Sequence, residues 1–197
     1  VSARVLGVTP DTLSKEWHDA YTKAYDPLIK KTQLVAPSSR VLFKGSEENR
    51  YNISPSLSPD GRSMMFLSTR DLFSIDLYLA DAQTGKIKKK ITSTATHAEF
   101  ESIQFIKSAG AWDLTGNRFA FGGISKGRPI LTILANEKIV DEIPFKNLDE
   151  IYSPTWSPDG RFIAFSGLAG GKTDLYIYDV GSKSLRQLTD DLFADLQ

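Results

Sequence analysis

The chain has 197 residues, of which 41% are hydrophobic and 24% charged, proportions typical of a folded globular protein. The 24 basic and 24 acidic residues balance, and no apolar run approaches the roughly 20 residues that span a bilayer, so neither nucleic-acid binding nor membrane insertion is predicted. Cysteine is absent, which excludes a disulfide scaffold, a thiolate metal site and a cysteine nucleophile. We therefore expect a protein partner, with small molecules as a second class of ligand.

The N-terminal segment is predicted to be helical. Residues 1–6 followed by Gly7 are typical of the end of one helix, and a second helix is expected to begin at Thr9, whose hydroxyl can cap it ahead of Pro10. An apolar stripe at helical spacing follows: Leu13, Trp17, Ala20, Tyr21, Ala24 and Leu28. We expect Pro27 to break or kink this helix just before it.

A sequence unit repeats in the rest of the chain. Residues 54–66 read SPSLSPDGRSMMF, residues 153–165 read SPTWSPDGRFIAF, and a looser copy at residues 111–121 reads AWDLTGNRFAF. The second half of the unit recurs as IDLYLADAQTG at residues 75–85 and TDLYIYDVG at residues 173–181. The alignment superimposes three positions: Leu57, Trp112 and Trp156.

Each part of the repeated unit has a physical interpretation. Ser-Pro-Asp-Gly favours a tight turn between two strands, because proline presets φ and glycine accepts a positive φ. The runs that follow are short, aromatic and β-branched, as strands are. Residues 86–92 and 185–189 supply a more polar fourth strand. Four antiparallel strands in a unit of this length predict a β-propeller blade.

These residues resemble the WD-like repeats of TolB-type β-propellers, whose blades combine a Trp-Ser-Pro-Asp-Gly turn, an Ile-Ala-Phe strand and an Asp-Leu-Tyr strand. The resemblance covers about residues 40–197; the middle copy departs from it, with Leu114-Thr115 in place of Pro-Asp and no Asp-Leu-Tyr. It implies a mainly β fold of about three four-stranded antiparallel blades after a short α-helical segment. It also implies a bacterial protein that is periplasmic or otherwise exported.

We divide the chain into a helical N-terminal segment with its linker, residues 1–36, and the blades, residues 37–197. The blades are expected at about residues 53–92, 100–145 and 150–190. Because propellers close with about four to eight blades, three are expected to form part of a larger ring that is incomplete at the C-terminal end. The combination also resembles exported bacterial proteins in which a zinc peptidase domain precedes helices and a TolB-like propeller.

No catalytic, metal or cofactor site is predicted. His18 and His97 are the only histidines and form no His-Glu-x-x-His motif, and no Gly-x-Ser-x-Gly motif occurs. Residues 166–173 end like a phosphate-binding loop, but they start with serine and lead into a strand. Asp76 and Asp174 are interpreted as hydrogen-bond acceptors within their blades rather than calcium ligands. The three tryptophans are interpreted as core residues: Trp17, Trp112 and Trp156.

Alternate connections of antiparallel strands emerge on opposite faces of a propeller. The Ser-Pro-Asp-Gly turns and the Thr84-Gly85 turn share one face. The opposite face carries the connections at residues 69–74, 122–128, 146–150 and 168–172, together with an expected insertion before the second blade at about residues 93–109. These differ between blades, as ligand-binding loops do, so we expect this face to bind. The candidate contacts are Arg70, Phe73, Lys126, Arg128 and Lys172.

The sequence therefore predicts a non-catalytic propeller module that binds a protein or a cell-envelope component. The alternative is the non-catalytic propeller portion of a larger hydrolase, either a zinc peptidase or a serine peptidase. A third hypothesis, an enzyme with its site on the propeller axis, needs convergent His, Asp or Glu residues on the innermost strands, and the sequence offers no such set.

Overall fold

The structure is a computed structural model that divides into two compact units, Val1–Val41 and Leu42–Gln197. It describes residues 7–32, 39–43, 51–71, 75–92, 109–191 and 193–195. The predicted helix end at residues 1–6, the predicted boundary between residues 36 and 37, and the residues Phe73 and His97 all lie outside the described parts.

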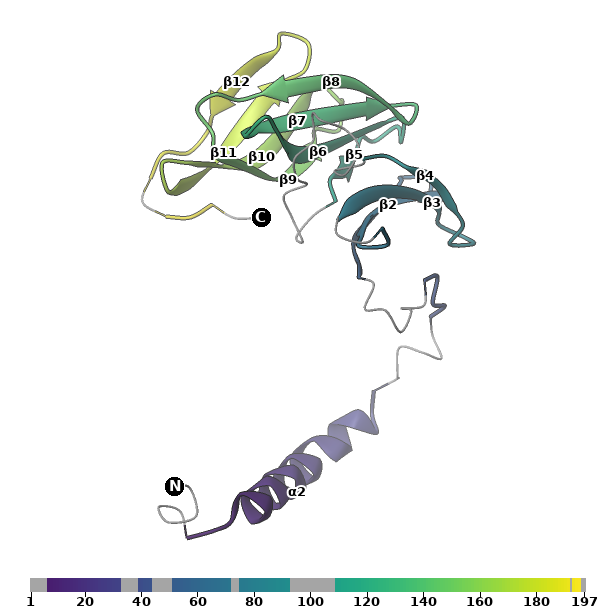
Figure 1. Ribbon diagram of the computed structural model, residues 1–197, viewed down its shortest axis with the longest axis vertical. Helices are drawn as coiled ribbons and strands as arrows, with labels where there is room; N and C mark the ends of the chain where they lie inside the picture. The colour runs from purple at the N-terminus through teal and green to yellow at the C-terminus, as the bar shows by residue number, and fades with distance from the viewer. Residues whose placement is uncertain are drawn as a thin grey trace. The chain divides into compact units, whose positions relative to one another are not determined.

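The described part of the first unit contains the helix α2 (Pro10–Ile29; Figure 1). Thr9 caps it as predicted, because its backbone is extended and its hydroxyl accepts a hydrogen bond from the Thr12 N–H at 3.2 Å. Of the break or kink expected at Pro27, the break is wrong, since the helix continues to Ile29. A proline in the last turn removes one hydrogen bond, and the turn still closes through the Lys30 N–H, which donates to the Asp26 carbonyl at 3.0 Å.

The apolar stripe of α2 is not a core, since none of the helix residues is buried. Trp17 is 53% exposed, and its ring contacts those of His18 and Tyr21 on the same helix. The prediction that Trp17 is a core residue is therefore wrong. His18 makes a local hydrogen bond, with its Nδ1 donating to the Ser14 carbonyl at 2.7 Å. No helix in the described residues is long and apolar enough to cross a membrane.

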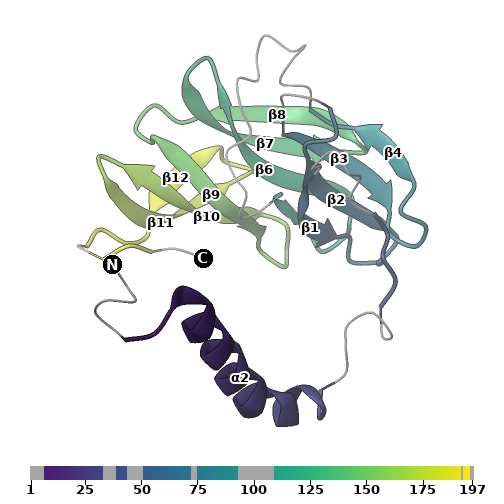
Figure 2. The ribbon, with the colours of Figure 1, turned by 60° about the horizontal axis from the view of Figure 1, so that its bottom comes forward.

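The described part of the second unit contains three four-stranded antiparallel sheets, which we name blades A, B and C (Figure 2). Blade A consists of β1 (Asn52–Leu57), β2 (Ser63–Ser68), β3 (Asp76–Asp81) and β4 (Ile87–Lys90). Blade B consists of β5 (Ala111–Trp112), β6 (Arg118–Ser125), β7 (Arg128–Ala135) and β8 (Lys138–Pro144). Blade C consists of β9 (Glu150–Trp156), β10 (Phe162–Ala169), β11 (Lys172–Asp179) and β12 (Ser184–Gln187). The predicted mainly β fold with four-stranded propeller blades is confirmed.

Blade B lies between blades A and C and packs on both of them through apolar layers (Figure 2). Side chains alternate along a strand, so Leu131 and Ile133 on β7 join the layer against blade C, while Ile130 and Leu134 join the layer against blade A. Burial on both sides explains why β7 reads as a continuous apolar run rather than an alternating one.

The tryptophan side chains link each blade to the one before it. The Trp112 indole N–H donates to the Ser56 carbonyl at 3.0 Å, and the Trp156 indole N–H donates to the Ala111 carbonyl at 3.1 Å. Ser56 and Ala111 each precede the aligned position of their own blade, so the same contact repeats one blade further along. This repetition confirms the alignment of Leu57, Trp112 and Trp156.

The β5–β6 turn of blade B closes like the corresponding turns of blades A and C, but a different side chain accepts the closing hydrogen bond. In blades A and C a serine hydroxyl accepts the hydrogen bond that closes the turn: Ser58 Oγ from the Ser63 N–H, and Ser157 Oγ from the Phe162 N–H. In blade B a carboxylate takes this role, because Asp113 Oδ1 accepts from the Arg118 N–H at 3.0 Å. The middle copy of the repeat therefore forms a genuine blade turn despite its divergent sequence.

Candidate functional site

The strand connections emerge on two faces of the blades. We name the turn face for the β1–β2, β5–β6 and β9–β10 turns, and the loop face for the β2–β3, β6–β7 and β10–β11 connections. Two loop-face connections are tighter than expected, because Lys126-Gly127 joins β6 to β7 and Gly170-Gly171 joins β10 to β11. All four residues have positive φ, between 51° and 82°, as two-residue hairpin turns require. The expectation of irregular loops at residues 122–128 and 168–172 is therefore wrong.

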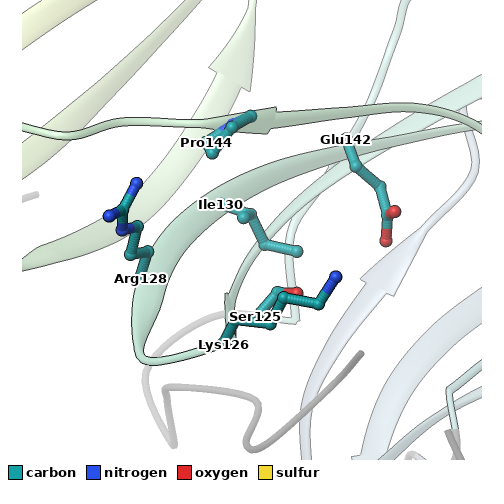
Figure 3. A pocket seen from close by; sticks show the side chains of 6 residues that line it. All are labelled: Ser125, Lys126, Arg128, Ile130, Glu142 and Pro144. Atoms are coloured by element: carbon teal, nitrogen blue, oxygen red, sulfur yellow. The ribbon is translucent and has the colours of Figure 1, made fainter. Parts of the chain in front are cut away.

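Two candidate contacts, Lys126 and Arg128, lie together in a groove of about 500 Å³ on the loop-face side of blade B (Figure 3). We call it the Arg128 groove, and its lining is Ser125, Lys126, Arg128, Ile130, Glu142 and Pro144. Ile130 and Pro144 are paired across β7 and β8 and form its apolar part. Figure 3 shows Lys126 and Glu142 extending on one side of Ile130 and Arg128 on the other.

Lys172 lines a second groove, of about 580 Å³, where the connection from β8 to β9 meets blade C. We call it the Lys172 groove, and Phe145, Leu148 and Tyr176 supply its apolar part. The Lys172 ammonium lies 3.7 Å from a carboxylate oxygen of Asp190, which also lines the groove. Burial raises the pKa of Tyr176, as do the charges of Asp174 and Asp190, so this hydroxyl stays protonated at neutral pH.

Arg70 lies at the end of β2, exposed, beside a cluster of paired charges in blade A. The Lys90 ammonium contacts both Asp71 and Asp76, the latter at 2.8 Å, and the Tyr78 hydroxyl donates to Asp71 at 2.9 Å. Burial lowers the pKa of Lys90, but its bonds to the two aspartates outweigh burial and raise that pKa above its ordinary value. Burial and the bond to Asp71 raise the pKa of Tyr78 to about 12. The charges in this cluster are therefore satisfied inside the blade.

The interpretation of Asp76 and Asp174 as acceptors within their blades is confirmed. Asp76 is fully buried and pairs with Lys90, while Asp174 accepts hydrogen bonds from Gln187 at 3.1 Å and Thr189 at 3.4 Å. Among the described residues, no group of three His, Asp or Glu side chains is placed to hold a metal ion.

Comparison with known proteins shows which fold the blades share. No family model matches the sequence. A curated relative, the Tol-Pal system protein TolB of Syntrophus aciditrophicus (strain SB), is 42% identical over 38 residues, 19% of this chain and 8% of that protein. The crystal structure of TolB from Acinetobacter baumannii matches with a TM-score of 0.55 and 24% identity, over 71% of this chain and 32% of that one. The described strands have the fold of TolB-like propeller blades.

Peptidase propellers share this fold. A prolyl endopeptidase structure matches with a TM-score of 0.53 and 14% identity, over 78% of this chain and 24% of that chain. The chain spans less than a third of the length of the TolB structure and 8% of the curated TolB relative. At these identities the structural likeness establishes the fold alone.

Sequence reasoning missed three residues that define the two grooves. Glu142 and Pro144 lie on β8, the fourth strand of the divergent middle copy, and Asp190 follows β12. Their positions depend on which residue of the fourth strand pairs with the third. In blade B that register includes a bulge between Ile133 and Leu134, which leaves no recognisable signal in the sequence.

Proposed function

We propose that the blades form a non-catalytic module that binds a protein partner through the loop face. The observation that carries this proposal is the Arg128 groove, where Lys126 and Arg128 are exposed and form no ion pair with any other described residue. Exposed charges beside an apolar surface are typical of interfaces in which the partner supplies the opposite charge. The likeness to TolB, by name a Tol-Pal system protein, supports a periplasmic location and a protein or cell-envelope partner.

A second candidate function is the propeller portion of a larger hydrolase, which the likeness to a prolyl endopeptidase supports. In that case the partner surface belongs to a catalytic domain of the same protein, and these blades still contribute binding rather than turnover. The two functions differ in whether the contact is made within one polypeptide or between two.

Photo-crosslinking from the two faces tests the proposed function. A photoreactive phenylalanine derivative replaces Lys126 on the loop face, and a matched variant replaces Leu114, which is 68% exposed in the turn of blade B on the turn face. In cells that naturally produce the protein, we expect a discrete crosslinked protein from position 126 and little or none from position 114. Equal crosslinking from both positions would contradict binding through the loop face.

A further inference from the structure

The Arg128 groove and the Lys172 groove occupy equivalent places in successive blades. Ser125 pairs with Arg128 at the end of the β6–β7 hairpin, and Ala169 pairs with Lys172 at the end of the β10–β11 hairpin. Arg128 and Lys172 are thus both the first residue of the third strand. The pairing of the third strand with the fourth also corresponds in the two blades. Thr132 pairs with Glu142 in blade B, and at the equivalent position of blade C Tyr176 pairs with Gln187.

The two grooves differ in how the basic residue is neutralised. In the Lys172 groove the chain supplies its own carboxylate, Asp190, the third residue after Gln187. The corresponding residue of blade B is Phe145, the third after Glu142, and it is buried in the layer against blade C. The blade B groove therefore has no counterpart of Asp190 on β8 or directly after it.

Positive charge dominates the Arg128 groove. Arg128 and Lys126 are exposed on either side of Ile130, and Glu142 carries the one carboxylate among the described residues that line the groove (Figure 3). Among the described residues none of these three side chains forms an ion pair. A ligand that carries a carboxylate would restore the pairing that Asp190 gives to Lys172.

The apolar part of the groove points to a polypeptide rather than a free anion. Ile130 is 3% exposed because it packs in the layer against blade A, while Pro144 is exposed beside it, so Pro144 supplies the accessible apolar surface next to the charges. A volume of about 500 Å³ is far larger than a carboxylate, and an inorganic anion would leave that surface uncovered. A short peptide covers the apolar surface, and its backbone N–H groups can donate to Glu142.

We propose that the Arg128 groove binds an acidic segment of a protein partner, with the partner's carboxylate between Arg128 and Lys126 and an adjacent apolar side chain on Pro144. This proposal rests on the proposed loop-face function and names the chemistry of the partner. The exposed ion pair of Lys172 and Asp190 adds little to stability. It shows, within this chain, the same kind of contact that we propose between Arg128 and the partner's carboxylate.

Peptide titration of the 197-residue chain tests the proposal, with backbone amide chemical shifts as the readout. The probe is acetyl-Leu-Asp-Leu-amide, compared with the uncharged acetyl-Leu-Asn-Leu-amide and with inorganic phosphate. We expect the acidic peptide to shift the amides of Gly127, Arg128 and Ile130 saturably, and the asparagine peptide to bind about tenfold more weakly or worse. Equal binding of the two peptides, or equal saturable shifts with phosphate, would overturn the proposal.

Exposed substitutions locate the binding. Arg128→Gln should abolish the shifts, whereas Lys172→Gln, the matched change in the equivalent position, should leave them unchanged because Lys172 is already paired. Asp190→Asn should expose Lys172 and create a second site, seen as new shifts at Gly171 and Lys172. Loss of binding in Lys172→Gln, or no new site in Asp190→Asn, counts against the proposal. If position 126 crosslinks a partner while the two peptides bind equally, the loop-face function stands and the acidic-segment proposal fails.

Discussion

Replacing Phe165 by alanine is expected to lower the free energy of unfolding of the blades by about 3 to 5 kcal/mol. Phe165 is 1% exposed in the layer between blades B and C. Its ring centroid lies 5.8 Å from that of Tyr176 and 5.6 Å from that of Phe145. Removing the ring takes away its apolar contacts and leaves a cavity, because the surrounding strands can relax only in part.

The matched control is Phe193→Ala, the same chemical change at a residue that is 78% exposed. It should change the free energy of unfolding by no more than about 0.5 kcal/mol. Urea unfolding followed by tryptophan fluorescence measures both variants, since Trp112 and Trp156 lie at the blade contacts. A similar small effect in both variants would mean that blade C does not pack on blade B through this layer.

The blade architecture was predictable because its signals are local. Ser-Pro-Asp-Gly sets two backbone conformations within four residues, and the serine and aspartate side chains bond the turn itself, as Ser58 Oγ does to Asp60 at 2.6 Å. The same pattern at Ser157 and Asp159 needs nothing from the rest of the fold. Because the turn and the strands recur together, four-stranded blades could be predicted from the sequence.

The loop-face turns and the helix packing were not predictable in the same way. Lys126 at the first position of a two-residue hairpin is a weak signal, since lysine rarely adopts positive φ, so the segment resembled a longer loop. The apolar stripe of α2 indicated a buried face, but periodicity shows only that a face is apolar and not what covers it. Trp17 therefore looked like a core residue from spacing alone.

The grooves required strand register as well as sequence. Arg128 and Lys172 were separate basic residues in the sequence, and their equivalence appears only once each is paired with the last residue of the preceding strand. Glu142 could not be placed in a groove beforehand, because a one-residue shift of β8 would move its side chain to the opposite face. The candidate contacts were therefore predictable individually, while their partners and surroundings were not.

Replacing Asp113 by alanine is expected to lower the free energy of unfolding by about 3 kcal/mol at neutral pH, because its carboxylate closes the turn of blade B while buried. Asp113 is 1% exposed and accepts hydrogen bonds from the backbone N–H groups of Asn117 and Arg118 and from the Arg118 guanidinium, each at 3.0 Å. The guanidinium in turn donates to the Gly160 carbonyl at 2.8 Å and lies over the Trp156 ring. Losing the carboxylate therefore weakens both the turn and the contact with blade C.

The pH dependence of that loss separates this carboxylate from a simple packing effect. Burial raises the pKa of Asp113, but the hydrogen bonds from Arg118 and Thr115 outweigh burial and hold the pKa below its ordinary value of 3.8. As pH falls, the unfolded chain therefore takes up the proton first, so the contribution of Asp113 is present above about pH 4 and is lost as pH falls through the lower folded pKa.

The difference in free energy of unfolding between the parent chain and Asp113→Ala should shrink from about pH 5 to about pH 2. Asp60 and Asp159, whose pKa values are also lowered by hydrogen bonds from Ser58 and Ser157, titrate in both proteins and cancel in this difference. A difference that stays constant over the same range would show that Asp113 stabilises the turn by its shape alone and not by its charge.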